Sequence, residues 1–191
     1  TQYLGFPHYG DEYKVMGLAP YGDASRFSDK LSSFYSLLPD GDYSLHRDRI
    51  VSLYEDLMPR QADQAFEQIH KDLSAALQQA LETIVLHMLR HFQKVTGQQS
   101  LALSGGVGQN SSMNGKIMQS GLFKQVFAPS FAADSGCAFG AAMYATYQSQ
   151  PALPFKRIEH AYWGTPTLVG NALYQVLAKW QGFVSIEKMD N

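Results

Sequence analysis

The strongest pattern along the chain is a long stretch in which apolar side chains recur every three or four positions. It runs from Asp63 to about Val95 without a glycine or a proline. The recurring apolar positions are Phe66, Ile69, Leu73, Leu77, Ala80, Ile84 and Met88. Apolar residues at this spacing lie on one face of an α-helix, and the apolar face widens in the later turns. We therefore predict a long helix that enters a domain interior and ends at Gly97.

After this helix the pattern changes to short apolar runs that alternate with helical segments. Residues 101–103 and 126–128 are predicted as strands, and residues 109–120 and 135–147 as helices. This order is typical of an α/β fold, in which parallel strands are joined by crossover helices. We divide the chain into one domain over residues 1–150 and a segment over 151–191 that contains a connector and a helix.

The segments outside this region are less regular. Residues 1–30 are rich in turns, and the other predicted features are one or two helical turns at 13–18, an amphipathic stretch at 27–38, a turn at 39–42, an ambiguous strand or helix at 43–58, a connector at 150–166 and a last helix at 167–180.

Composition narrows the class of protein. The 191 residues carry a formal charge of −2, so there is no bulk attraction to nucleic acid or to an anionic membrane. A hydrophobic share of 45% excludes a disordered chain. The charged share of 17% is below the usual value of about 25%, and we expect an apolar face that another domain covers. One cysteine, Cys137, fits a reducing compartment such as the cytoplasm. No apolar run approaches the roughly 18 residues of a membrane helix.

A glycine-rich loop follows the first predicted strand, where residues 104–110 read SGGVGQN. Glycines between a strand and a helix let the backbone approach an anion, so that N–H groups face its charge. Gly105, Gly106 and Val107 are the candidates for phosphate binding. The loop lacks both the Walker pattern and the Gly-x-Gly-x-x-Gly pattern, so a plain tight turn stays open as an alternative.

Three polar residues near the predicted helix starts are further candidates. Asn110 and Asn114 lie one turn apart, and they either contact a ligand or cap and solvate their helix. Asp134 stands where a loop meets the next helix. It either caps that helix or supplies a carboxylate to a divalent metal beside the glycine-rich loop.

The N-terminal segment 10–22, with the sequence GDEYKVMGLAPYG, contains the last candidates. The two carboxylates Asp11 and Glu12 and the amine of Lys14, framed by glycines, could contact the ribose or phosphates of a nucleotide. A solvated loop with one ion pair is the simpler alternative. His87 and His91 have the spacing of a two-histidine metal site, but Met88 replaces the glutamate of the metalloprotease motif. We interpret them as packed histidines.

Two further side chains of reactive types, those of Cys137 and His8, stand apart from these candidates in the interpretation of the sequence. Cys137 lies among small apolar residues without a basic neighbour in sequence, and we interpret it as unreactive. His8 has no partner that the sequence shows.

Together, three motifs resemble the NodU/CmcH family of O-carbamoyltransferases. They are KVMGLAPYG at 14–22, LALSGGVGQN at 101–110 with its continuation at 114–116, and DSGCAFGAA at 134–142. The resemblance extends over about residues 3–148. It implies the second lobe of an ATP-binding domain of the actin/hexokinase/Hsp70 (ASKHA, ribonuclease H-like) type, similar to the tRNA threonylcarbamoyl-transferase proteins.

The resemblance also implies a function. Family members use carbamoyl phosphate and ATP to make a carbamoyladenylate, and they pass the carbamoyl group to a hydroxyl of a sugar, an antibiotic or a similar acceptor. The residues that would match the nucleotide site are Gly105, Gly106, Val107 and Asn110, with Glu12 and Lys14 in a segment that approaches the nucleotide. Asp134 would match a ligand of the active-site metal, which is often iron (Fe2+).

Two features depart from the family pattern. Residues 108–110 read Gly-Gln-Asn where the family usually has Ala-Leu-Asn. The family's paired metal-binding histidines and its C-terminal adenylate-forming domain lie outside this chain. We therefore expect an enzyme as the full-length protein and an inactive piece in these 191 residues. The alternatives are a non-catalytic nucleotide-binding module and a sugar or acetate kinase, and the motif at 14–22 disfavours the kinase.

Overall fold

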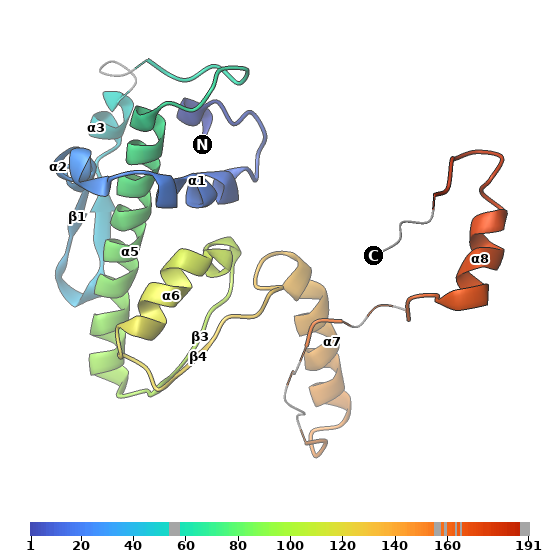
Figure 1. The fold of residues 1–191 in the computed structure, drawn as a ribbon. Coiled ribbons are helices and arrows are strands. Elements are labelled where there is room, and N and C mark those ends of the chain that lie inside the picture. Colours follow the sequence, from blue (N-terminus) through green and yellow to red (C-terminus); the bar gives the residue numbers. More distant parts are fainter. Residues whose placement is uncertain (54–57, 155–157, 159, 163, 165, 188–191) are drawn as a thin grey trace. The chain divides into compact units, whose positions relative to one another are not determined.

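The computed structural model describes residues 1–53, 58–154, 158, 160–162, 164 and 166–187. The chain forms two compact units, Thr1–Leu153 and Pro154–Asn191. The first unit is a mixed α/β structure with one long helix and two small sheets of two strands each (Figure 1). In the described residues, no helix is both long enough and apolar enough to cross a bilayer.

The elements follow one another in a fixed order along the chain. They are η1 (Gln2–Leu4), α1 (Glu12–Leu18), η2 (Ala19–Tyr21), η3 (Ala24–Arg26), α2 (Ser28–Ser32), β1 (Tyr35–Leu37), η4 (Pro39–Gly41), β2 (Tyr43–Leu45), α3 (Arg47–Val51), α5 (Gln68–Thr96), β3 (Ser100–Ala102), η5 (Gly106–Gln109), α6 (Ser111–Gln119), β4 (Gln125–Phe127), α7 (Ser135–Ser149) and α8 (Gly170–Ala178).

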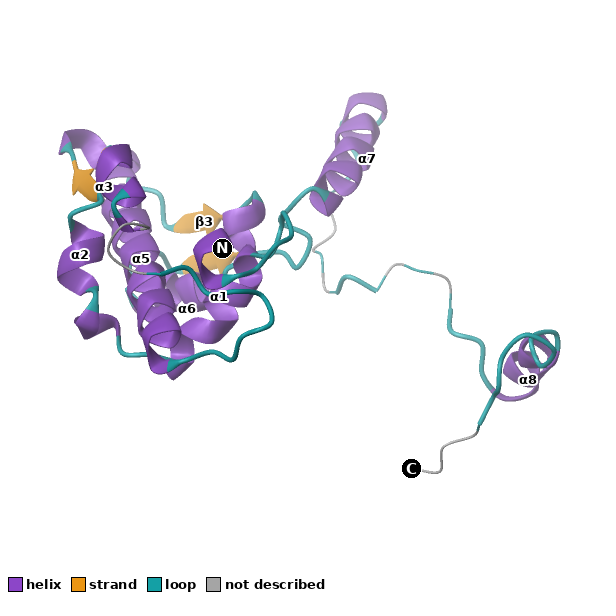
Figure 2. Ribbon diagram, turned by 90° about the horizontal axis from the view of Figure 1, so that it is seen from above, coloured by secondary structure: helices purple, strands orange, loops and turns teal. Residues whose placement is uncertain are grey.

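Helix α5 carries the core of the first unit. Its first half packs against the N-terminal segments, and Figure 2 shows α1, α2 and α3 arranged around it. The buried apolar residues of this core are Tyr3, Leu4, Val15, Leu31, Phe34, Leu73, Ala76 and Ala80. Burial of these side chains is the main favourable contribution to the stability of this part of the fold.

Helix α5 starts later than the sequence predicts, at Gln68 instead of Asp63. A capping box sets this start, because the N–H of Glu67 donates to His70 Nδ1 at 3.0 Å while the Glu67 side chain accepts the N–H of His70. The helix ends as predicted, since Gly97 has a φ of 66° and a left-handed conformation.

The second half of α5 is not in the interior, contrary to our prediction. Its buried residues lie only between His70 and Ala80, whereas Phe92 and Val95 are 51% and 66% exposed. The described neighbours of this half are a short hairpin and α6, and these are too small to cover the whole apolar face. The predicted apolar face is therefore present, but it is only partly covered.

The hairpin β1–β2 lies against this second half of α5. Its strands are antiparallel, and they connect through the turn that the sequence predicts at 39–42. A Cβ on Gly41 would lie 2.7 Å from the Cβ of His91, so the turn approaches the helix closely. Nε2 of His87 lies 2.9 Å from the carbonyl oxygen of Leu38. His87 and His91 are therefore packing residues, as interpreted above.

The strands β3 and β4 pair in parallel, which confirms the predicted α/β order. Residues Ser100, Leu101 and Ala102 lie opposite Gln125, Val126 and Phe127. Helix α6 connects the two strands, and α7 follows β4. Each of these elements falls within two residues or so of its predicted position.

The region from 27 to 53 contains more elements than the sequence indicated. The amphipathic stretch at 27–38 divides into α2 and β1, and the ambiguous stretch at 43–58 contains β2 and α3, with residues 54–57 outside the described residues. Three-residue strands with a serine in the middle, such as β1 and β2, give too short a pattern to recognise.

The segment after α1 is fixed to α5 by a close backbone approach. A Cβ on Gly22 would collide with the backbone of Lys71 and Asp72. Beside this contact the buried Asp72 carboxylate accepts the N–H of Asp23 at 2.8 Å and Nη1 of Arg26 at 3.0 Å. The hydrogen bond from Asp23 is the main cause that holds the pKa of Asp72 below its usual value, and the one from Arg26 adds to it.

The second unit contains α8, within the range 167–180 that the sequence predicts for a last helix. None of its helical residues is buried. Beyond the helix, the rings of Trp180 and Phe183 contact each other edge to face, with centroids 6.3 Å apart.

Replacing Gly22 by alanine should destabilise the chain by about 1–3 kcal/mol, because the added methyl must push the segment away from α5. Gly17 on α1 is the matched control. A Cβ there meets no atom within 4 Å, so Gly17→Ala should leave stability unchanged or raise it by up to about 1 kcal/mol. Urea unfolding measures both, and equal midpoints for the two variants would contradict the close approach.

His70 should make the stability of the chain depend on pH. Burial is the main cause that lowers the pKa of His70, and Arg60 adds to it, while Glu67 acts in the opposite direction. The unfolded chain binds a proton near pH 6.5 and the folded chain resists it, so stability should fall as the pH drops below about 6.5.

His70→Gln is the variant that isolates this effect, because glutamine also completes a capping box but does not titrate. The free energy of unfolding should lose its His70-dependent slope between pH 7 and 5 in this variant. An unchanged slope would show that the ring at position 70 does not resist protonation.

Candidate functional site

The glycine-rich loop and the loop that carries Asp134 lie side by side. The N–H of Gly105 donates to the carbonyl oxygen of Ala132 at 2.7 Å, and Nε2 of Gln109 lies 3.3 Å from the carbonyl oxygen of Ser130. Both loops leave the carboxyl ends of the parallel strands β3 and β4, the position where open α/β sheets bind ligands. Two of the three sequence motifs therefore meet at one edge.

The glycine-rich loop presents two backbone donors. Gly105 has a φ of 91°, and its own N–H is already bonded, so this residue supplies the turn. The first hydrogen bond of η5 runs from Gly108 N–H to Gly105 oxygen, at 3.0 Å. The N–H groups of Gly106 and Val107 precede that bond, and neither has an acceptor in the described part of the chain. The loop can thus offer these two N–H groups to an anion.

Asn110 links this loop to α6 and α5. Its Oδ1 accepts the N–H of Met113 at 2.9 Å, which caps α6, and it also accepts Nε2 of Gln78 at 3.0 Å. Its Nδ2 donates to Oε1 of Gln78 at 2.9 Å. The capping alternative from the sequence is therefore correct, and one N–H of the Asn110 amide is left for a ligand.

Asn114 supports the loop from one turn further along α6. Its Nδ2 donates to the carbonyl oxygen of Gly108 at 2.8 Å. Its Oδ1 is buried and has no hydrogen-bond partner among the described residues. A buried acceptor of this kind is unusual in folded proteins.

Asp134 is exposed at the start of α7. Its backbone is helical, with φ −54° and ψ −33°, and its side chain makes no capping hydrogen bond. The capping alternative is therefore wrong here, because a capping residue needs an extended backbone. Among the described residues, no three histidines, cysteines, aspartates or glutamates are grouped as metal ligands. The described residues therefore offer a metal one candidate ligand at this place, the carboxylate of Asp134.

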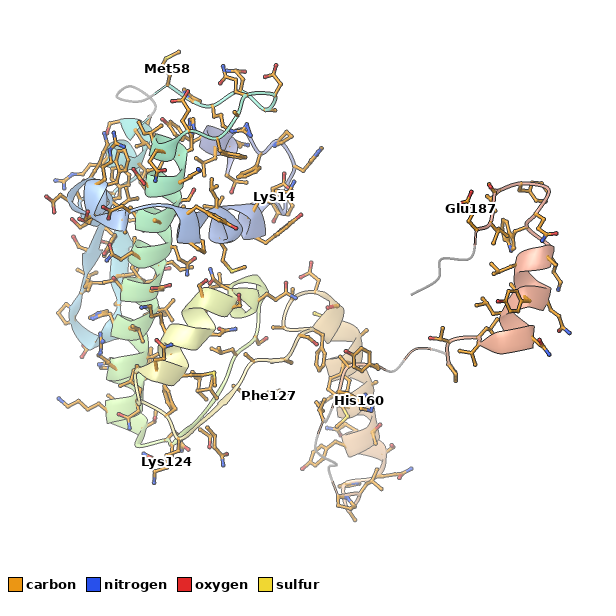
Figure 3. The ribbon with its side chains drawn as sticks, in the orientation of Figure 1. Lys14, Met58, Lys124, Phe127, His160 and Glu187 are labelled. Carbon is orange, nitrogen blue, oxygen red and sulfur yellow. The ribbon has the colours of Figure 1, made fainter. Side chains whose placement is uncertain are left out.

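In the N-terminal motif, the ion pair forms between Asp11 and Lys14. Nζ of Lys14 lies 2.8 Å from Oδ1 of Asp11, and Lys14 holds the pKa of Asp11 below its usual range. Glu12 is exposed. The segment is the helix α1 rather than a loop, but the single ion pair matches the simpler alternative. Figure 3 shows Lys14 on α1 and Phe127 at the end of β4, on separate elements.

A cleft of about 540 Å³ lies between η2, α5 and α6. One of its lining residues is Gln78, which is hydrogen-bonded to Asn110 at the end of the glycine-rich loop. Its lining residues are mostly small or polar: Ala19, Pro20, Ala24, Ala75, Gln78, Gln79, Glu82, Ser111, Ser112, Gly115, Lys116 and Gln119. The end of the N-terminal motif and the helix after the glycine-rich loop thus both line one cleft.

The side chains of three other residues considered from the sequence, His87, Cys137 and His8, make no described contact with the glycine-rich loop or with the loop of Asp134. Nε2 of His87 is bonded to the hairpin, Cys137 is an exposed free thiol, and the backbone N–H of His8 donates to Oδ2 of Asp11 at 3.2 Å.

Comparison with known proteins decides the family. A family profile described as "Carbamoyltransferase N-terminus" matches residues 1–143. This chain belongs to the carbamoyltransferase family. It is 44% identical over 191 residues to nodulation protein NolNO of Sinorhizobium fredii, and 43% identical over 191 residues to nodulation protein NolO of Bradyrhizobium diazoefficiens. Nodulation protein U of Azorhizobium caulinodans is 34% identical over 86 residues, which is 44% of this chain and 15% of that protein.

The two nodulation proteins that match over the whole chain are much longer than this chain. The match covers all of this chain but only 28% of NolNO and 35% of NolO. The chain therefore spans about a third of the length of these two relatives.

Sequence reasoning missed three residues of this candidate site. Gln78 and Glu82 lie on the polar side of α5, and Ala132 contributes only a backbone oxygen. Nothing local marks them, because each acts through a partner that is distant in sequence.

Proposed function

We propose that this chain is the nucleotide-binding part of an ATP-dependent O-carbamoyltransferase. One observation carries the proposal. In a chain of the carbamoyltransferase family, the glycine-rich loop is hydrogen-bonded to the loop of Asp134, and its Gly106 and Val107 N–H groups have no acceptor among the described residues. In the full-length protein, carbamoyl phosphate would be hydrolysed to carbamate and phosphate. A carbamate oxygen would then bond to the α-phosphorus of ATP as pyrophosphate leaves, which gives a carbamoyladenylate. The oxygen of a hydroxyl acceptor would then bond to the carbamoyl carbon, and AMP would leave.

The ATP would be held by the backbone of the glycine-rich loop. The N–H groups of Gly106 and Val107 would bind phosphate oxygens, as backbone donors before a helix do in other anion sites. The remaining N–H of Asn110 would contact the nucleotide. The adjoining cleft has a volume of about 540 Å³, within the range of small-molecule sites, and would hold the nucleoside part. The exposed Glu12 and the paired Lys14 would lie in the segment that approaches the nucleotide.

A divalent metal, with iron as the candidate, would use the exposed Asp134 carboxylate as one ligand. A bound metal supplies Lewis-acid polarisation of a carbonyl or phosphoryl oxygen. The described residues offer no second grouped ligand, so we assign the other ligands to the rest of the full-length protein and derive no step through the metal.

We place this chain in the second lobe of an ASKHA-type ATP-binding domain, which would act with a first lobe and an adenylate-forming domain. The order of β3, α6, β4 and α7 supports this, as does the long helix before them. The exposed apolar side chains of Phe92, Tyr144 and Tyr147 are compatible with coverage by another part of the protein. These 191 residues alone should therefore be inactive.

Gly106→Ala tests the phosphate loop in the full-length protein. A Cβ at Gly106 meets no atom within 4 Å, so the fold should tolerate it, whereas the methyl should block the approach of a phosphate. ATP affinity should fall at least tenfold, or about 1.4 kcal/mol, by calorimetry. The control is Gly140→Ala on α7, which is equally open and should bind ATP normally. Equal affinities for the two variants would refute phosphate binding at this loop.

Asp134→Ala tests the metal ligand. The side chain is exposed and makes no capping bond, so the melting temperature should stay within about 1–2 °C of the wild type. Carbamoyl transfer by the full-length protein should be abolished, and bound metal should decrease when measured by atomic emission. Transfer at the wild-type rate would remove Asp134 from the site.

A further inference from the structure

We propose that Gln78 is a positioning residue, which orients the amide of Asn110 and thereby the nucleotide contact of the glycine-rich loop. This inference rests on the proposed function, because it needs the loop to bind a nucleotide. It adds a residue that lies 32 positions before Asn110, on a different helix.

The first step is the geometry of the pair. The two carboxamides face each other with two antiparallel hydrogen bonds, of 3.0 Å from Gln78 Nε2 to Asn110 Oδ1 and 2.9 Å from Asn110 Nδ2 to Gln78 Oε1. Two bonds between planar groups fix both the direction and the rotation of the Asn110 amide. A single bond would leave the amide free to turn about it.

The second step is that Glu82 fixes Gln78. Nε2 of Gln78 also donates to Oε1 of Glu82 at 2.8 Å, so both of its hydrogens are used. A flipped Gln78 amide would bring its oxygen against the Glu82 carboxylate and would lose a donor. The Gln78 oxygen must therefore face Nδ2 of Asn110.

The third step connects the pair to the loop. The backbone N–H of Asn110 donates to Val107 oxygen at 2.9 Å, while its Oδ1 accepts the N–H of Met113. Asn110 thus stands between the two loop donors and the first turn of α6. Because Gln78 takes one hydrogen of Nδ2, it sets the direction of the other, which is the hydrogen available to a ligand.

These contacts predict that Gln78 matters more for binding than for folding. Without Gln78, Asn110 still caps α6 through Met113, and Gln78 itself is only half-buried. The lost hydrogen bonds are partly accessible to water, which replaces them at a modest net cost. The free Nδ2 then rotates, and the nucleotide must restrict it again on binding.

The experiment uses the full-length protein and steady-state carbamoyl transfer with ATP varied. Gln78→Ala should raise the KM for ATP about tenfold with kcat changed less than about threefold. Gln93→Ala is the matched control, since it is the same substitution on α5, about 22 Å further along the helix, and its side chain makes no hydrogen bond within the described residues. It should leave both constants unchanged.

Two further variants separate positioning from a general structural role. Gln78 lines the cleft and also bonds Asn110, so the double variant tests which contact matters. If Gln78 acts through Asn110, adding Gln78→Ala to Asn110→Ala should raise the KM no further. Glu82→Gln keeps an acceptor but adds a donor, so it no longer fixes the direction of the Gln78 amide. It should raise the KM for ATP in the same direction as Gln78→Ala, but by less. Melting temperatures of Gln78→Ala and Gln93→Ala should agree within about 3 °C.

The outcomes also distinguish this inference from the proposed function. A wild-type KM in Gln78→Ala, together with a raised KM in Asn110→Ala, would overturn the role of Gln78 and leave ATP binding at the loop intact. Additive effects of the two substitutions would overturn it as well. If the wild-type protein transfers no carbamoyl group with ATP, the proposed function fails, and this inference fails with it.

Discussion

The arrangement of the first unit depends on what is packed along helix α5. Near its start, Asp72 and the backbone beside it hold the segment after α1 through Gly22. One and a half turns later Gln78 reaches the glycine-rich loop, and His91 lies under the hairpin turn near the end of the helix. Because a helix rises about 1.5 Å per residue, the spacing of these contacts fixes the N-terminal motif, the loop and the hairpin relative to one another.

Much of this fold follows from local sequence signals. The spacing of apolar residues predicted α5, and Gly97 after the last of them predicted where the helix ends. Short apolar runs predicted the parallel strands β3 and β4. The start of α5 was missed because His70, instead of the usual glutamate or glutamine, completes the capping box. The burial of α5 was overestimated because periodicity shows an apolar face but not what covers it.

The candidate site was predictable as a set of motifs but not as a set of atoms. Glycines between a strand and a helix indicated the loop, yet only the structure shows that Gly105 N–H is used internally, which leaves Gly106 and Val107 as donors. The choice of Asp11 rather than Glu12 as the partner of Lys14 depends on the turn that opens α1. Contacts between residues far apart in sequence, such as that of Gln78, have no local signal.

The exposed position of Asp134 has a consequence for how variants of this family are surveyed. Its carboxylate makes no capping bond, and the neighbouring loop leaves open space at Gly106, so neither side chain position contributes to holding the fold together. A survey that measures cellular abundance would score substitutions at both positions as harmless. Under the proposed function, chemistry and folding depend on different residues, and only a survey that measures turnover would detect a loss of chemistry.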